Sequence, residues 1–240
     1  MKITRLMVFV PLLVAFTVSA ASAELVAKIR RVDGSASILR KGGEKWMDAK
    51  VGMPLAEGDQ FCTRSESFAE ILYHDGALVR LDENSKITIV KLTEGSASTS
   101  TPLGNVWVNA KKLVNGKRDF QLSSPTATAA IRGTVFQMKA AADSSTDVSV
   151  YNGKVAVGPK KSDSASAPPP ADDFETTGPE EVPPPYEVSL DQWRMIVAGQ
   201  VISIHKDGSF SQNKIDPDKA KHDAFVKKNE SLDATWEKEK

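Results

Sequence analysis

One cysteine and three histidines are the residues of this 240-residue sequence that could support nucleophilic or metal chemistry. Cys62 could act as a nucleophile with His74 as its base if the two met across neighbouring strands, but no third group is placed to orient the histidine. His74, His205 and His222 lack the spacing of zinc ligands, and the sequence contains no Cys-x-x-Cys pair. We therefore predict no catalytic, cofactor-binding or metal-binding residue.

Paired carboxylates and glycine motifs add no further catalytic candidate. Asp172 and Asp173 fall in a proline-rich stretch, where nothing would desolvate them. The sequence has neither a Gly-x-Ser-x-Gly elbow nor a phosphate-binding glycine loop. An enzyme is therefore the weaker class, and we expect this protein not to be one.

The charge balance and the hydrophobic content narrow the remaining classes. Lys and Arg together number 31, and so do Asp and Glu. No net field therefore draws the chain to nucleic acid, and we expect no nucleic-acid partner. Hydrophobic residues make up 40% of the chain, which is enough for a folded core and excludes a wholly disordered protein.

The first 23 residues have the three parts of a secretory signal peptide. Lys2 and Arg5 precede an apolar run over 6–18, and Ala21-Ser22-Ala23 follows ahead of Glu24. The apolar run is shorter than the roughly 20 residues that a membrane-spanning helix needs. We predict cleavage between Ala23 and Glu24, a periplasmic or secreted protein, and no membrane span after cleavage.

Short β-branched runs separated by turn residues predict an antiparallel all-β domain over residues 24–158. Dipeptides that accept positive φ occur at Asp33-Gly34, Asp75-Gly76, Asn115-Gly116, Asn152-Gly153 and Asp207-Gly208. Two of them predict hairpins from the flanking alternation of apolar residues. One hairpin joins 68–74 to 77–81, and the other joins 148–150 to 155–157.

The remaining sequence divides into three segments. Residues 159–187 hold most of the prolines, with two Pro-Pro-Pro triplets, and predict an extended, flexible insertion. Residues 188–211 regain a strand pattern but are too few for a core of their own, so we expect them to return and complete the first domain's sheet. Residues 212–240 form a charged tail.

The tail predicts a helix, because Asp216-Pro217 is a good N-cap followed by proline at the first helical position. Phe225, Leu232 and Trp236 are spaced to lie on one narrow apolar stripe. Two interpretations fit this stripe. The helix rests on the domain, or the three side chains contact a partner.

Three stretches of the sequence resemble the FecR-type domain, the periplasmic domain of ferric-citrate regulators. They are Glu57-Gly58-Asp59 with SESFAEIL over 65–72, HDGALVRL over 74–81 with Asn84-Ser85, and Phe120-Gln121-Leu122 with SPTATAA and IRGTVF over 124–136. The segment VSVYNGKVAV over 148–157 is similar to the family's closing hairpin. We interpret the motif residues as structural. They are Gly58, Asp59, Asp75, Gly76, Arg80, Pro125, Arg132, Gly133, Thr134, Asn152 and Gly153.

The resemblance implies a fold of bent β-strands in a solenoid-like or sandwich-like arrangement. It also implies a binding or regulatory role. The ferric-citrate regulators place a cytoplasmic anti-sigma segment and a membrane span ahead of this domain. We expect neither in this chain, so we do not expect it to carry a signal across the membrane alone.

Three functional hypotheses follow. The leading one is an exported, non-enzymatic module that binds an envelope protein or a cell-wall glycan as a scaffold. The alternative is a soluble component of a periplasmic signalling system that contacts a receptor or a membrane-bound regulator. An envelope hydrolase that uses Cys62 and His74 is the weakest. The sequence leaves the identity of the partner and the oligomeric state open.

The predicted cleavage site can be tested directly. We expect protein recovered from the periplasm or medium of an expressing bacterium to begin at Glu24, because small residues precede that bond. Intact-mass spectrometry would then give the mass of residues 24–240. A mass that includes residues 1–23 would contradict the prediction.

Overall fold

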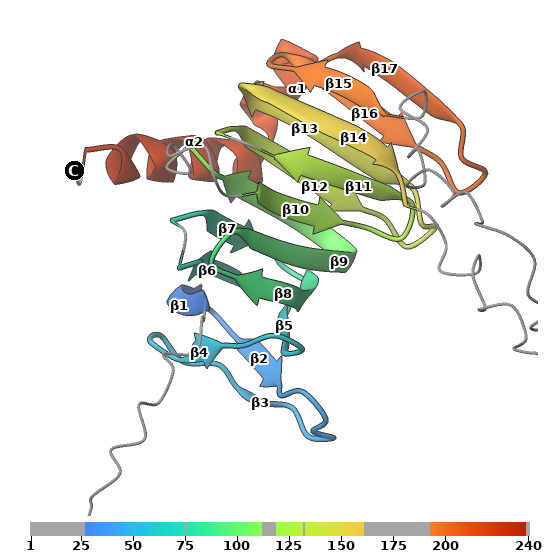
Figure 1. Ribbon diagram of the computed structural model, residues 1–240. Coiled ribbons are helices and arrows are strands. Elements are labelled where there is room, and N and C mark those ends of the chain that lie inside the picture. Colours follow the sequence, from blue (N-terminus) through green and yellow to red (C-terminus); the bar gives the residue numbers. More distant parts are fainter. Residues whose placement is uncertain (1–26, 75, 112–118, 132, 161–192, 239–240) are drawn as a thin grey trace, which may run out of the picture.

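The computed structural model describes residues 27–74, 76–111, 119–131, 133–160 and 193–238 (Figure 1). These residues are mostly β-strands, stacked along one direction, with two helices near the C-terminal end. The predicted fold class, all-β with a C-terminal helix, is confirmed. The predicted signal peptide with Ala23 and Glu24, and residues 161–187 of the predicted insertion, lie outside the described residues.

The described strands form two sheets that face each other across one core. Sheet A runs in the order β4 (Pro54–Leu55), β1 (Ala27–Asp33), β6 (Phe68–Leu72), β7 (Leu78–Leu81), β9 (Ser96–Asn109), β12 (Val135–Ala140), β13 (Thr146–Asn152), β16 (Gln200–Ile204) and β17 (Phe210–Lys214). Sheet B runs in the order β3 (Met47–Asp48), β2 (Ala36–Leu39), β5 (Gln60–Thr63), β8 (Lys86–Thr93), β9, β10 (Asp119–Ser123), β11 (Ala127–Ile131), β14 (Lys154–Pro159) and β15 (Arg194–Val197). All these pairs are antiparallel except β9 with β10, which is parallel.

Strand β9 joins the two sheets because it bends in the middle. Residues 96–100 pair with β10 in sheet B, whereas residues 104–109 pair with β12 in sheet A. Gly104 stands at the bend with a φ of 109°, and a Cβ there would overlap the Cα and side chain of Ser85. Glycine is needed at this position for both its conformation and its size.

Most other links between the sheets also turn at a residue with positive φ. In the described chain these corner residues are Gly34, Gly52, Gly58, Glu66, Asn84, Gly133, Gly153 and Gly199. Each corner sends the chain from a strand of one sheet to a strand of the other. The result is a stack of bent strands, as the family resemblance implied.

One of the two predicted hairpins is confirmed and the other is wrong. Strands β6 and β7 pair antiparallel, as expected for 68–74 and 77–81, although Asp75 lies outside the described residues. Asn152-Gly153 does not close a hairpin, because β13 pairs with β12 and β16 while β14 pairs with β11 and β15. The alternating pattern misled the prediction because both arms face the same core from opposite sheets.

Residues 194–204 extend both sheets. Strand β15 pairs with β14 at the end of sheet B, and β16 pairs with β13 in sheet A. The side chains of Ile196, Ile202 and Ile204 lie in the main core. The domain boundaries that the sequence predicted stay a prediction.

Two helices follow the last strand. Asp216 caps α1 (Pro217–His222), and Asp223 caps α2 (Ala224–Trp236) by accepting hydrogen bonds from the amides of Phe225 and Val226. Helix α2 lies along one side of the strand stack (Figure 1). Neither helix is long and apolar enough to cross a membrane.

The bend in β9 generates a stability prediction. We expect Gly104→Ala to lower the free energy of unfolding by roughly 2–4 kcal/mol, because strained backbone and overpacking against Ser85 add together. Gly42→Ala is the matched control, since Gly42 also has a positive φ of 70° but no atom within 4 Å of the new Cβ. It should lose about 1 kcal/mol. Equal losses in urea denaturation would contradict this account.

Candidate functional site: the interface between α2 and sheet A

The site lies on the outer face of sheet A, which α2 covers. Side chains alternate along a strand, so Glu70, Arg80 and Trp107 point away from the core while their neighbours point into it. These outward side chains are nevertheless buried, with Arg80 and Trp107 each 1% exposed. Helix α2 therefore removes from water a face that the sheet alone would leave open.

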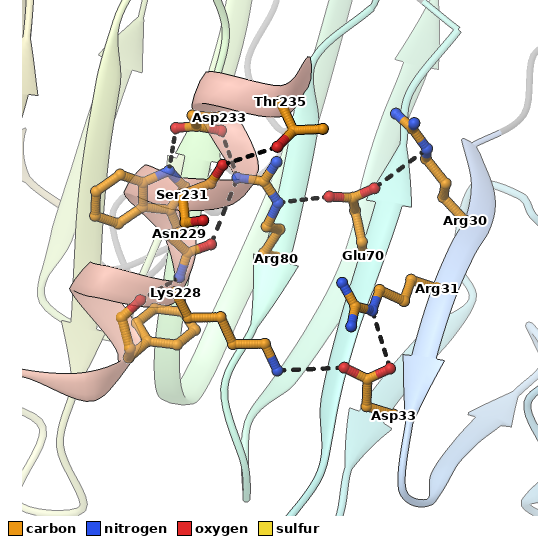
Figure 2. Close-up of polar contacts among 12 residues, drawn as sticks. Arg30, Arg31, Asp33, Glu70, Arg80, Lys228, Asn229, Ser231, Asp233 and Thr235 are labelled. Atoms are coloured by element: carbon orange, nitrogen blue, oxygen red, sulfur yellow. Dashed lines mark hydrogen bonds and ion pairs between the residues drawn. The ribbon is translucent and has the colours of Figure 1, made fainter. Parts of the chain in front are cut away.

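Arg80 is the centre of the polar contacts at this interface (Figure 2). Its Nε donates to Oε2 of Glu70 at 2.5 Å, and its Nη1 donates to Oδ1 of Asp233 at 2.5 Å. The Oδ1 atom of Asn229 lies 3.5 Å from the same Nη1. Trp107 Nε1 donates to the second oxygen of Asp233 at 3.0 Å. One carboxylate thus joins α2 to both β7 and β9.

The charges of this group balance. Arg30 Nε lies 3.3 Å from Oε1 of Glu70, so Arg30, Glu70, Arg80 and Asp233 form a row of alternating sign. The Arg30 guanidinium also stacks 4.0 Å from the ring centroid of Trp236. Burial of charges at this depth requires such pairing and hydrogen bonding.

A second polar contact ties the first half of α2 to β1. Lys228 Nζ donates to Asp33 at 3.2 Å and lies 3.7 Å from the ring centroid of Phe68. Arg31 Nε donates to the other oxygen of Asp33 at 2.9 Å. Partial burial alone would raise the pKa of Asp33, but the hydrogen bonds and charges of Arg31 and Lys228 outweigh it and lower that pKa.

The apolar part of the interface is separate from the main core. Phe225 and Val226 of α2 pack with Phe68, Trp107 and Val135 in a second cluster. The rings of Phe68 and Phe225 meet edge to face at 6.3 Å, and the rings of Trp107 and Tyr151 lie 4.7 Å apart. The main cluster between the sheets contains no residue of α2.

A cavity of about 270 Å³ adjoins the start of α2. Tyr151 lies on its wall and donates from its hydroxyl to Gln137 at 2.9 Å. Burial, together with the charges of Asp223 and Glu230, raises the pKa of Tyr151 well above its ordinary value. The phenol therefore stays protonated and keeps its role as a donor throughout the physiological pH range.

The three tail residues that the sequence singled out contact this chain's own sheet. Phe225 is buried in the second cluster, Leu232 packs against that cluster, and Trp236 stacks on Arg30. Leu232 and Trp236 stay partly exposed, whereas a partner could reach the buried Phe225 only if α2 left sheet A. Their role as partner contacts stays a prediction.

Asn229 and Asp233 were missed by sequence reasoning. They follow Phe225 by four and eight positions and so share its face of α2, where they are 0% and 7% exposed. Polar residues on an apolar stripe were the available signal. What the sequence could not supply was their partner Arg80, about 150 positions earlier in the chain.

Arg80 is the motif residue that the structure brings into the site, whereas the other described motif residues lie at turns and corners. Asp59 is buried at 3% exposure and accepts from Arg40 Nη1 at 2.6 Å and from the amides of Lys41 and Ala56 at 3.0 Å. It braces a turn and does not contact α2. The predicted motif residues Asp75 and Arg132 lie outside the described residues.

The remaining described motif residues lie near turns of the chain and outside the interface with α2. Each lies in a link between strands or at the end of one. These residues are Gly58, Gly76, Pro125, Gly133, Thr134, Asn152 and Gly153.

Cys62 and His74 are not brought together. Cys62 is on β5 in sheet B, and His74 follows β6 in sheet A with its Nε2 3.1 Å from the carbonyl oxygen of Thr93. No hydrogen bond joins the two within the described ranges. No group of three or more His, Cys, Asp and Glu side chains could hold a metal ion in that same part of the chain.

Comparisons with known proteins find a matching family model and similar crystal structures. The family model described as "FecR protein" matches residues 59–156, from β5 to β14, which is less than half of the chain. Two crystal structures of a "putative anti-sigma factor" from Parabacteroides distasonis are similar at 15% identity, with a TM-score of 0.47. The match covers 65% of this chain and 60% of that protein. No curated protein matches the sequence.

The ion pair between Asp233 and the buried Arg80 should contribute strongly to stability. We expect Asp233→Asn to lower the free energy of unfolding by about 3 kcal/mol, because Arg80 stays buried with one of its two carboxylate partners removed. The control is Glu237→Gln, which breaks the exposed pair with Lys111 at 2.6 Å and should change stability by less than about 1 kcal/mol. Equal effects of the two variants in urea denaturation would contradict a central role for Asp233.

Proposed function

We propose that the protein is an exported, non-enzymatic binding module of the cell envelope, because residues 59–156 match the family model described as "FecR protein". The observation that carries the proposal is the family match itself, because the FecR family is regulatory rather than enzymatic. The most elaborate polar site that the described residues form supports it. That site joins a helix to a sheet with balanced charges and leaves no reactive group free.

A protein partner is favoured over a glycan by the state of the tryptophans. A sugar-binding platform needs an open aromatic face. Trp107, Trp193 and Trp236 already have a neighbour packed against the ring, which is Tyr151, Gly158 and Arg30 respectively. Trp46 is 38% exposed, with Lys86 Nζ 5.3 Å from its ring centroid.

The regulatory character of the family also supports the second candidate function. In this version the protein is a soluble component of a signalling system and contacts a receptor or a membrane-bound regulator. Both versions require export, which we infer from the signal-peptide pattern of residues 1–23. They differ in whether the partner transmits a signal.

The test is capture of an envelope component on the purified protein. We expect immobilised protein to retain one membrane protein from a detergent-solubilised envelope extract. Excess free protein should abolish that retention, and the purified candidate should then bind directly. Prior protease treatment of the extract should remove the signal, whereas digestion of the glycan should not.

The alternative outcomes separate the hypotheses. Retention that survives protease and is lost on glycan digestion would indicate a wall-binding module. A captured regulator, together with a changed transcriptional response when this protein is deleted, would favour the signalling version. Failure to retain any component would contradict the proposal.

A further inference from the structure

We propose that the outer face of sheet A beneath α2 is the partner-binding surface, and that α2 is a displaceable occupant of it. We call this surface the helix seat. It consists of Phe68, Glu70, Arg80, Trp107, Val135 and Tyr151. The partner it fits is an amphipathic helix with an aromatic side chain and, eight positions later, a carboxylate. This inference rests on the proposed binding function and gives it a location.

The sandwich does not need α2 to complete its core. The cluster between the two sheets is built entirely from strand residues and the links between them, and α2 contributes only to the second, smaller cluster. No strand pairs with the helix, so its contacts are made through side chains. Departure of α2 would therefore uncover the helix seat and leave the fold in place.

The helix seat has the composition of a protein-binding surface. Trp, Tyr and Arg are the residue types that most often carry the energy of protein interfaces, and the seat places Trp107, Tyr151 and Arg80 close together. Without a helix above them, two large rings and a guanidinium would face water on one patch. Such a patch requires an occupant, which α2 supplies in the arrangement described here.

Charge decides which occupant fits. With α2 removed, Arg80 would lose Asp233 and keep Glu70, which also contacts Arg30. An occupant must bring a carboxylate to Arg80 Nη1 and Trp107 Nε1, as Asp233 does. It must also place an aromatic ring beside Phe68, about 12 Å earlier along the helix axis.

The buried face of α2 is itself suited to exchange. Two of its four buried residues, Asn229 and Asp233, are polar. A buried ion pair adds specificity more than affinity, because desolvation offsets much of its attraction. A partner helix with the same pattern can therefore compete with α2. A purely apolar helix would leave Arg80 Nη1 without a carboxylate to accept its hydrogen bond.

A peptide copy of α2 is the probe that tests this inference. We would measure the affinity of a fluorescent peptide of residues 217–238 for the purified full chain by anisotropy. The peptide should bind the Asp233→Asn chain at least tenfold more tightly than the unchanged chain. The reason is that the tethered helix competes for the seat and the substitution weakens that competitor.

Three control variants and one hydrogen-exchange measurement test this explanation. Adding Arg80→Met to the Asp233→Asn chain should abolish peptide binding, and so should Asp233→Asn in the peptide. The Glu237→Gln chain should behave like the unchanged chain, because that exposed pair lies outside the seat. Amide hydrogen exchange in the Asp233→Asn chain should accelerate more in α2 than in β6, β7 and β9, because the helix detaches before the sandwich unfolds.

Each other outcome would overturn the inference. Equal peptide affinity for both chains would show that α2 does not occlude the seat. Peptide binding to the chain that also carries Arg80→Met would show that Arg80 does not select the peptide's carboxylate. Unchanged exchange in α2 would show that Asp233 does not hold the helix. Unfolding of the sandwich in the Asp233→Asn chain would show that the core depends on α2. None of these results would affect capture from envelope extract, so the two proposals fail separately.

Discussion

The guanidinium of Arg80 imposes the strongest constraint on this molecule. It is almost fully buried on the outer face of sheet A, where its positive charge is tolerated only because Glu70 and Asp233 accept its hydrogen bonds. Glu70 comes from the neighbouring strand, but Asp233 arrives only with α2. The position of the C-terminal helix is therefore set by a charge that belongs to the sheet.

The bent-strand architecture places that charge where a helix can reach it. Each corner sends the chain between sheets, so both sheets bury alternate side chains in one shared core and leave the others on the outside. On sheet B the outward side chains of β8, β10 and β14 are exposed or partly exposed. On sheet A they form a row across β6, β7 and β9 that α2 covers.

Sequence reasoning succeeded where the information is local. The Asp75-Gly76 dipeptide predicted the β6–β7 hairpin, and Asp216-Pro217 predicted the start of a helix. It failed at Asn152-Gly153, because a turn dipeptide with flanking alternation does not say whether the next strand pairs with the last or crosses to the other sheet. The charged interface was beyond reach, since Arg80 and Asp233 are joined only by the fold.

The mixture of ring contacts and paired charges beneath α2 differs from what stability alone would select. An apolar helix on an apolar face would hold at least as well, because the desolvation of a buried ion pair offsets most of its attraction. A buried carboxylate between Arg80 and Trp107 instead makes the surface selective, since any helix without that carboxylate leaves two donors unsatisfied. A surface that discriminates between helices is useful only if more than one helix can occupy it. The polar chemistry of this interface is therefore better explained by exchange of its occupant than by a purely structural role.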